Sequence, residues 1–224
     1  MENSRQKNAF LKYEADAWFG RNKKIIESYS VETDKVVSLI TDYRLKPKRL
    51  LEVGCSAGYR LNGIKQMFKN CDVFGIEPSL AAINYGKKKY PLVNFQKGTA
   101  DDMRCYKSES MDIVIVGFVF YVVDRSVLLK AVAEIDRVLK NGGELIIIDF
   151  FSEKPNKNRY KHIKNDSAFA YKQNYEAIFT SANLYHLLSK STFSHIAKAY
   201  DASKDYFDKY SITLLKKDIN ASYK

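Results

Sequence analysis

Residues 50–77 read LLEVGCSAGYRLNGIKQMFKNCDVFGIE, in which an apolar run, a turn of small residues, an amphipathic segment and a second apolar run follow one another. Small residues let the backbone turn sharply, and the first turn of a helix offers free N–H groups to a ligand. Leu61, Ile64 and Phe68 share one face of the amphipathic segment, which predicts a helix. The stretch therefore predicts a strand, a ligand loop, a helix and a second strand. The alternative is an ordinary strand-to-helix turn.

Apolar runs of the same kind continue after this stretch. They are LVNFQK (92–97), MDIVIVGF (111–118) and ELIIIDF (144–150), and they alternate with segments of helical spacing at 36–40 and 127–139. Strands that are apolar on both faces are typical of a parallel sheet covered by helices on each side. We therefore expect a doubly wound α/β fold. The glycines of Asn141-Gly142-Gly143 would cap the helix that precedes the fifth strand.

The last third of the chain, 151–224, contains no glycine and a single proline, Pro155. Because tight turns favour these residues, we expect helices there, followed by two final strands around 185–189 and 210–215. No repeat or linker divides the chain. We expect one domain over 1–224, with an N-terminal helical lid at 1–49, a cofactor-binding core at 50–150, and substrate-covering helices and final strands at 151–224.

The composition predicts a folded protein, because 46% of the residues are hydrophobic and 13% are aromatic. No apolar run reaches about 18 residues, and MENSRQKNAF at the start lacks the apolar segment of a signal peptide. We expect a cytoplasmic protein without a membrane partner. Cys55, Cys71 and Cys105 lack the spacing of a metal site, and their odd number fits a reducing compartment. No metal is predicted.

The formal net charge of +11 comes from the two flanks, 1–49 and 151–224, whereas the middle of the chain is nearly balanced. A lysine-rich surface usually serves solubility. An anionic small substrate is the second interpretation, and a nucleic-acid partner is the least favoured. The sequence indicates no oligomeric state.

Glu77 ends the second apolar run, 23 residues after Gly54, and Pro78 and Ser79 follow as a helix start. Ligands of open α/β sheets bind beyond the carboxyl ends of the strands, where a carboxylate can accept hydrogen bonds from both hydroxyls of a ribose. We expect a nucleoside, the alternative for Glu77 being a capping or surface carboxylate. A dinucleotide-binding dehydrogenase is disfavoured, because its fingerprint needs glycines where this chain has Ser56 and Tyr59.

Five motifs then occur in register: EVGCSAG (52–58), GIEPS (75–79), KGTADDM (97–103), DIVIVGFVFYVVD (112–124) and RVLKNGGELIIID (137–149). With them the chain resembles the class I S-adenosylmethionine-dependent methyltransferases, particularly the small-molecule branch that includes ubiquinone and menaquinone methyltransferases. YEADAWFGRNK (13–23) and the Tyr-rich tail resemble a subgroup from surface-polysaccharide and natural-product clusters. The resemblance implies a Rossmann-like sheet of seven mainly parallel strands, with a C-terminal antiparallel strand and helical additions at both ends that form a lid.

The resemblance also implies roles for individual residues toward S-adenosyl-L-methionine. Glu52 would steady the loop, and Gly54, Cys55 and Gly58 would surround the methionine part. Glu77, with Pro78 beside it, would hold the ribose. Ala100 and Asp101 would meet the adenine. Asp102 is the second candidate for this role, and a solvated acidic turn is the alternative for both carboxylates. Phe118 would line the cofactor near the sulfonium. The chain departs from the family at Ser56, where glycine is common, which bears on how closely the backbone approaches the cofactor.

A sulfonium is already a strong methyl donor, so only some acceptors need a general base. His162, in RYKHIKND, is the preferred candidate, with a surface histidine as the alternative reading. Asp149 and Tyr121 come next, because they follow strand ends that face the ligand crevice. Trp18, the only tryptophan, is expected on an N-terminal helix that lies over the cofactor, where it would shield the sulfonium. The alternative is that it packs in the core.

The expected function is methyl transfer from S-adenosyl-L-methionine to a small-molecule acceptor, with a hydroxyl of a sugar or sugar nucleotide as the example. The alternatives are an RNA methyltransferase and a catalytically silent scaffold that binds the cofactor.

Overall fold

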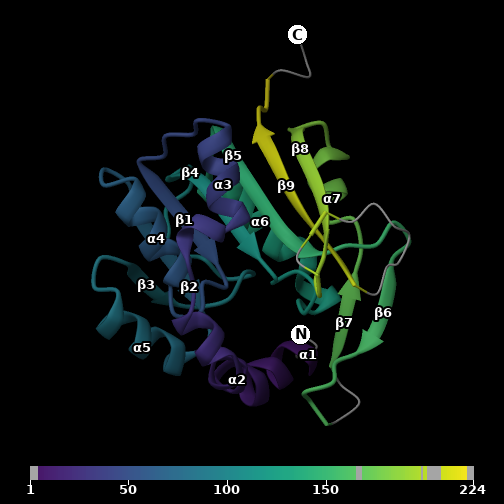
Figure 1. Ribbon diagram of the computed structural model, residues 1–224. Coiled ribbons are helices and arrows are strands. Elements are labelled where there is room, and N and C mark those ends of the chain that lie inside the picture. Colours follow the sequence, from purple (N-terminus) through teal and green to yellow (C-terminus); the bar gives the residue numbers. More distant parts are fainter. Residues whose placement is uncertain (1–4, 165–167, 198, 201–207, 221–224) are drawn as a thin grey trace.

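Seven strands form the central sheet of the computed structural model, which describes residues 5–164, 168–197, 199–200 and 208–220 (Figure 1). In chain order they are β1 Arg49–Val53, β2 Asp72–Glu77, β3 Asn94–Lys97, β4 Met111–Gly117, β5 Leu139–Phe150, β8 Tyr185–Ser194 and β9 Lys209–Lys217. Across the sheet their order is β3-β2-β1-β4-β5-β9-β8. The first five are parallel, and β9 pairs antiparallel with β5 and with β8. The predicted mainly parallel sheet with a C-terminal antiparallel strand is confirmed.

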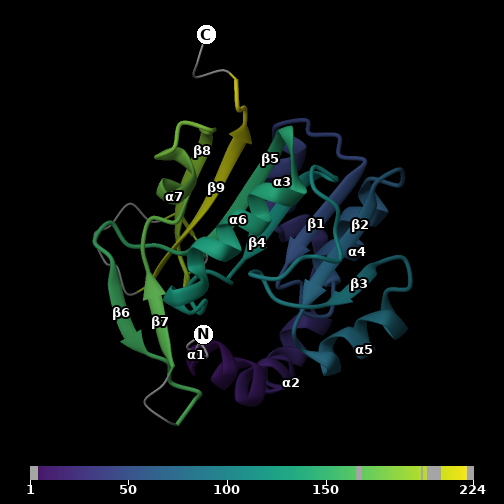
Figure 2. The ribbon, with the colours of Figure 1, turned by 180° about the vertical axis from the view of Figure 1, so that it is seen from behind.

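Helices cover both faces of this sheet. One face carries α3 Lys35–Asp42, α4 Tyr59–Met67 and α5 Leu80–Lys89, and the other carries α6 Leu128–Val138 and α7 Glu176–Thr180 (Figures 1 and 2). Successive side chains of the central strand β4 alternate between the two cores, with Ile113 and Ile115 in one and Val114 and Val116 in the other. All four are fully buried, which is why this strand is apolar throughout.

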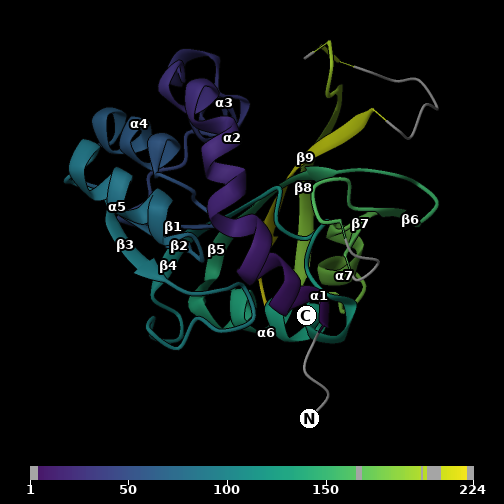
Figure 3. The ribbon, with the colours of Figure 1, turned by 90° about the horizontal axis from the view of Figure 1, so that it is seen from below.

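A helical run of residues 5–27 crosses the carboxyl ends of the parallel strands (Figure 3). It consists of α1 Arg5–Ala9, the π-helical turn η1 Phe10–Glu14 and α2 Ala15–Glu27. The 3-10 turn η2 Val31–Thr33 then leads to α3, where Asp34 accepts the N–H groups of Val36 and Val37 as an N-cap. The helices expected in 1–49 are present, but α3 packs on a face of the sheet and not over its edge.

Of the helices expected in 151–224 before the final strands, the described residues contain only the five-residue α7, so this expectation is confirmed only in part. The strands β6 Asn156–Arg159 and β7 Phe169–Lys172 form an antiparallel hairpin between β5 and α7. The connection from Arg159 to Phe169 is long, so this hairpin needs no glycine in a tight turn. The final strands β8 and β9 occur where they were expected, and each extends beyond the predicted range.

Asn141, Gly142 and Gly143 lie inside β5 and do not cap the helix before it, which corrects a second expectation. The register of β4 with β5 shifts between the pairs Met111–Leu139 and Ile113–Glu144, so the glycines occupy a bulge in the strand, where Gly142 has φ +80°. The end of α6 is stabilised by Lys217 instead. Its Nζ donates to the carbonyls of Asp136 and Leu139, at 2.8 and 3.2 Å.

In the ranges that the structure describes, no helix has both the length and the apolar content required to cross a membrane.

Candidate functional site

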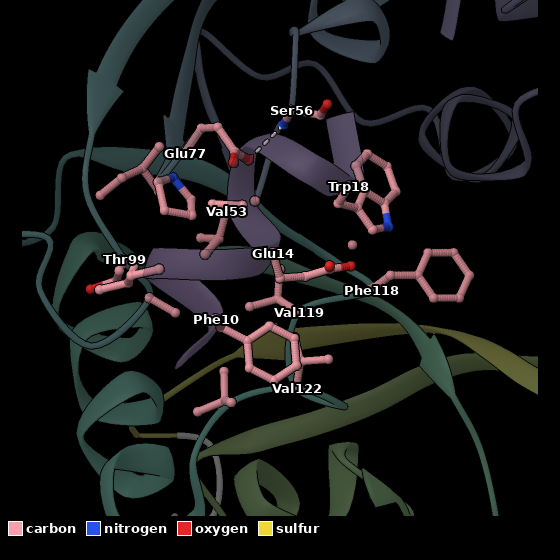
Figure 4. A pocket seen from close by; sticks show the side chains of 18 of the residues that line it. Phe10, Glu14, Trp18, Val53, Ser56, Glu77, Thr99, Phe118, Val119 and Val122 are labelled. Atoms are coloured by element: carbon pink, nitrogen blue, oxygen red, sulfur yellow. Dashed lines mark hydrogen bonds between the residues drawn. The ribbon is translucent and has the colours of Figure 1, made fainter. Parts of the chain in front are cut away.

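A cavity of about 270 Å³ lies between the carboxyl ends of β1, β2 and β4 and the helical run of residues 5–27 (Figure 4). We call it the strand-end cavity. The helical run contributes residues spaced three or four positions apart, as one helix face does: Lys7, Phe10, Leu11, Glu14, Ala15 and Trp18. The π-helical turn η1 lies in the middle of this face, and such turns often occur at functional sites.

The loop after β1 approaches the cavity through three residues in the left-handed region. Gly54, Ser56 and Gly58 have φ of +72°, +49° and +74°. A Cβ on Gly54 would collide with Val119, so this position requires glycine. Ser56 has the backbone conformation that a glycine would adopt, at a cost of about 1–2 kcal/mol for a residue with a side chain. Ser56 therefore gives the loop a turn in the left-handed region that a glycine at this position would also allow.

Glu77, at the end of β2, holds this loop. Its two carboxylate oxygens accept the N–H groups of Ser56 and Ser79, each at 2.9 Å. Burial raises the pKa of Glu77 to about 7, because the side chain is almost entirely removed from water. Each oxygen keeps a second lone pair, so the oriented carboxylate can still accept two hydroxyl groups from a ligand. Pro78 lines the cavity beside it.

Asp101 is the acidic residue that the loop after β3 places at the cavity. Its carboxylate is buried and accepts from Nζ of Lys7 on α1, at 2.6 and 2.8 Å. Ala100 lines the same part of the wall. The neighbouring Asp102 is partly exposed and does not line the cavity, and its hydrogen bond with Arg104 lowers its pKa to about 2. The structure therefore favours Asp101 over Asp102 as the ligand-facing residue.

Gln6 fastens α1 to two other segments. Its side-chain nitrogen donates to the carbonyls of Val122 and Phe169, at 2.8 and 3.0 Å, and its side-chain oxygen accepts the N–H of Phe169 at 3.1 Å. Together with Lys7, it ties the helical run to the loops after β3 and β4 and to β7. Sequence reasoning missed both residues, because their partners lie far away along the chain.

Glu52, Arg60 and Asp34 form a buried charged triad beside the loop. Arg60 donates to Glu52, and its Nε donates to Asp34 at 2.8 Å. Burial raises the pKa of Glu52 to about 7, and the charge of Arg60 opposes this rise. Glu52 lines the strand-end cavity, and its Oε2 has no hydrogen-bond partner among the described residues. A buried carboxylate oxygen without a donor is suited to accept one from a ligand.

A second cavity of about 1350 Å³ adjoins the first. The two cavities share six residues: Trp18, Tyr59, Arg60, Phe118, Tyr121 and Tyr160. Phe118 has φ +52°, and its ring packs against Phe150 and Tyr210 at centroid distances of 5.2 and 5.8 Å. A ligand in either cavity would therefore contact this shared aromatic wall.

The second cavity is strongly cationic, and we call it the basic cavity. Among the described residues that line it, Asp34 is the only acidic one, and it is paired with Arg60, which also binds Glu52. Basic groups come from the helical run, from α3 and α4 and from the β6–β7 hairpin: Arg21, Lys35, Arg60, Arg159, Lys161 and Lys172. A cleft lined by one sign of charge concentrates ligands of the opposite sign.

Glu14 is a site residue that sequence reasoning missed. Only 3% of its surface is exposed, and it lines the strand-end cavity between Trp18 and Phe10 on the helical run (Figure 4). Its Oε1 accepts from the hydroxyl of Tyr160 at 2.6 Å and from Arg21. Its Oε2 has no partner in the described parts of the chain. The three-and-four spacing of the face from Lys7 to Trp18 was the signal that could have found it.

The three predicted catalytic residues lie in different environments. Tyr121 lines both cavities, and burial raises the pKa of its hydroxyl. His162 is exposed and lines only the basic cavity. Asp149 lines neither. It accepts the N–H groups of Phe150 and Tyr121, at 2.8 and 3.3 Å, so it holds the turn after β4 and does not face an acceptor.

Two of the predicted cofactor residues, Cys55 and Gly58, do not line the strand-end cavity. Cys55 is buried in the core, with its Sγ against Gly75 of β2. Gly58 is the N-cap of α4 and packs against Phe95. The other predicted cofactor residues all line the strand-end cavity: Trp18, Glu52, Gly54, Glu77, Pro78, Ala100, Asp101 and Phe118.

Residues 51–147 match the family model described as "Methyltransferase domain". They form a class I S-adenosylmethionine-dependent methyltransferase domain. The chain is also 30% identical, over 122 residues, to a protein of Campylobacter jejuni named "Ubiquinone/menaquinone biosynthesis C-methyltransferase UbiE". That match covers 52% of this chain and 49% of the relative, so the chain spans about half the length of the curated relatives it matches.

Solved structures share the fold of the methyltransferase domain. The Burkholderia thailandensis 1,6-didemethyltoxoflavin-N1-methyltransferase has a TM-score of 0.71 at 10% identity, with 97% of this chain and 92% of that chain covered. A Thermotoga maritima protein described as a possible histamine N-methyltransferase has a TM-score of 0.59 at 18% identity, with 94% and 99% covered. At these identities the likeness concerns the fold alone.

The methyltransferase domain has the groups that S-adenosylmethionine would need. Glu77 can accept hydrogen bonds from both ribose hydroxyls, and Asp101 can accept a hydrogen bond from the amine of the adenine. Oε2 of Glu52, which no described residue contacts by a hydrogen bond, can accept one from the ammonium group of the methionine part. Among the described residues, no group of three or more His, Cys, Asp or Glu side chains could hold a metal ion.

Proposed function

We propose that this protein transfers a methyl group from S-adenosyl-L-methionine to a small anionic acceptor. The observation that carries this proposal is the shared wall of the two cavities. The strand-end cavity has the groups that suit the donor, the basic cavity has room for an acceptor, and both contact Phe118, Tyr121 and Trp18. Donor and acceptor would meet at these three side chains.

Bound S-adenosyl-L-methionine supplies an activated methyl group on a sulfonium. The protein then has two tasks, which are to align the acceptor with that methyl group and to exclude water. Alignment in a near-attack geometry can account for roughly 7–11 kcal/mol of a reaction barrier. The aromatic residues of the shared wall serve both tasks, because their rings are rigid and apolar. The helical run of residues 5–27, fastened by Gln6 and Lys7, closes the cavity on the side opposite the strands.

An anionic acceptor is supported by the charge of the basic cavity. Arg159, Lys161 and Lys172 come from the hairpin, and Lys35 and Arg21, which also binds Glu14, come from the N-terminal helices. The one carboxylate among the described lining residues, that of Asp34, is paired with Arg60. A sugar nucleotide is an acceptor of this class, because its phosphates would meet the cations and its sugar hydroxyl would reach the shared wall. The relatives do not favour one acceptor atom, since one is named as a C-methyltransferase and another as an N1-methyltransferase.

Calorimetry tests the donor half of this proposal. Both S-adenosylmethionine and S-adenosylhomocysteine should bind, and Glu77→Ala should weaken each by about 10- to 150-fold, as expected for loss of a charged hydrogen-bond acceptor. Asp72→Ala is the matched control, because Asp72 is exposed at the opposite end of β2. If neither ligand binds the wild-type protein at about 100 μM, the proposed function is wrong.

Methyl transfer from a radiolabelled donor tests the acceptor half. The panel contains sugar nucleotides and sugar phosphates, the corresponding neutral sugars, and RNA. We expect label on phosphorylated acceptors only. Label on RNA that decreases steeply between low and moderate salt would support an RNA methyltransferase instead. Tight donor binding without transfer to any acceptor would support a silent scaffold.

A further inference from the structure

We propose that Tyr160 and Glu14 form a proton relay, in which the hydroxyl of Tyr160 takes the proton from the acceptor and passes its own to Glu14. This inference rests on the proposed function and adds a catalytic residue, Tyr160, together with the group that finally receives the proton. Neither Tyr160 nor Glu14 is among the general bases expected from the sequence, which were His162, Asp149 and Tyr121.

The position of Tyr160 is the first argument. It follows β6, it is buried, and it lines both the strand-end cavity and the basic cavity. Its hydroxyl donates to Oε1 of Glu14 at 2.6 Å, a short distance typical of an O–H group bound to a carboxylate. Because this hydroxyl donates its only hydrogen to Glu14, its oxygen can act only as an acceptor. The side chain of Tyr121 is hydrogen-bonded to it, so a proton from the cavity side reaches Tyr160 beside or through Tyr121.

The environment of Glu14 is the second argument. Arg21 and Tyr160 both hold Oε1, so the carboxylate is fixed in one orientation. Oε2 is buried and has no hydrogen-bond partner in the described ranges, although a buried carboxylate oxygen ordinarily has a donor. Figure 4 shows this carboxylate in the strand-end cavity, close to Trp18 and Phe118. A positive charge in this cavity would therefore lie near a carboxylate oxygen to which no described residue donates a hydrogen bond, although the same carboxylate is paired with Arg21 through Oε1.

The proton balance of the step is complete within these groups. The O–H or N–H bond of the acceptor breaks, and its electron pair stays on the acceptor atom that bonds to the methyl carbon. The proton passes to the oxygen of Tyr160 while the proton of Tyr160 passes to Oε1 of Glu14. Tyr160 is unchanged at the end, and Glu14 is a carboxylic acid. The negative charge of Glu14 is lost in the same reaction in which the positive charge of the donor is lost. Arg21, the ion-pair partner of Glu14, then keeps its charge, and its side chain is 37% exposed, so water can solvate it.

The first test measures donor binding and needs no acceptor. Wild-type protein should bind S-adenosylmethionine, which is a cation, more tightly than neutral S-adenosylhomocysteine. Glu14→Gln keeps the size and the hydrogen-bonding oxygen but removes the charge, so it should reduce this preference by about tenfold. Glu27→Gln is the matched control, because Glu27 is exposed at the far end of the same helical run. An unchanged preference in Glu14→Gln would overturn the inference.

The second test is a double-mutant cycle on methyl transfer, with the acceptor that the labelled panel identifies. Glu14→Gln and Tyr160→Phe should each lower kcat by about 100-fold or more, and the double variant should lose no more than either single variant, because a relay fails when one member is removed. Additive losses, or an undiminished kcat in Tyr160→Phe, would contradict the relay. If the wild type transfers no methyl group to any acceptor, the proposed function is wrong. If the wild type and both variants are equally active, the proposed function stands and the relay is wrong.

Discussion

The Nζ of Lys7 lies 2.6 and 2.8 Å from the two carboxylate oxygens of Asp101, and this ion pair joins the first helix of the chain to the loop after β3. The two residues are 94 positions apart in the sequence. Asp101 is almost fully buried, so its charge would be poorly compensated without Lys7. The pair therefore acts as a latch at one end of the helical run.

Opening this latch should loosen the helical run. We expect Lys7→Met to lower the free energy of unfolding by about 1–2 kcal/mol, because it leaves a buried carboxylate unpaired. Amide hydrogen exchange of residues 5–14 should become faster, while exchange in β4 stays slow. Lys12→Met is the control, because Lys12 is exposed on the same run. Equal exchange in both variants would show that the latch does not hold the run.

Trp18 should report the arrival of the donor. It is the only tryptophan, and it lines both cavities next to Tyr59. Its fluorescence should change on addition of S-adenosylmethionine, because a cation would enter the space beside the indole. Trp18→Phe should remove the signal and still bind the ligand in calorimetry. A wild-type protein that binds S-adenosylmethionine with no change in fluorescence would place Trp18 outside the site.

The core of the fold could be predicted because its signals are local. Residues 50–77 contain their own apolar periodicity and turn residues, and the strands and helix occur there almost at the predicted bounds. The hairpin of β6 and β7 could not be predicted in this way. Asn156–Arg159 has no apolar alternation, and part of the hairpin's stability comes from a distant contact, in which the N–H of Tyr171 bonds to the carbonyl of Tyr121 at 2.7 Å.

The residues of the site likewise differ in whether a local sequence pattern predicts them. Glu77, Asp101 and Phe118 follow strand ends, and the carboxyl ends of parallel strands meet at one edge of the sheet, so sequence reasoning could bring them together. Lys7 and Glu14 face the same cavity only because the helical run crosses that edge, and no local pattern specifies how a helix is placed there. Cys55 shows that a local pattern can also mislead. A residue in a loop that is predicted to bind a ligand need not point its side chain toward that ligand.

The buried carboxyl of Asp149 should make stability depend on pH. Burial raises its pKa from 3.8 to about 7, against the opposing hydrogen bonds from backbone N–H groups. Between these two values the folded protein holds a proton that the unfolded chain has released, so the free energy of unfolding falls as the pH rises. Its contribution is constant below about pH 4 and above about pH 7.

Comparison with Asp149→Asn isolates this effect, because the other titrating groups are common to both proteins. The difference in the free energy of unfolding, wild type minus variant, should decrease between about pH 4 and pH 7, by as much as about 3–4 kcal/mol. Urea denaturation at several pH values measures it. A difference that is constant with pH, or one that increases, would show that Asp149 is ionised in the folded protein.

The cations of the basic cavity should act on the acceptor and not on the donor. Lys161 is exposed and lines only the basic cavity, so Lys161→Glu reverses a charge without touching the strand-end cavity. We expect the KM for a phosphorylated acceptor to rise by about tenfold and the Kd for S-adenosylmethionine to stay within about twofold, because charges near a cleft mainly govern the capture of an ion of opposite sign. Steady-state kinetics and calorimetry measure the two quantities.

The matched control for this prediction is Lys154→Glu, which makes the same change of charge just before the hairpin, at an exposed residue that lines neither cavity. Raising the ionic strength should weaken acceptor binding in the wild type and should have less effect in Lys161→Glu, since added salt screens the attraction that the substitution removes. Equal KM increases in the two variants would mean that the acceptor responds to net charge alone. An unchanged KM in Lys161→Glu would show that the acceptor does not use this cation. A larger increase in KM for a neutral acceptor than for a phosphorylated one would contradict an anionic substrate.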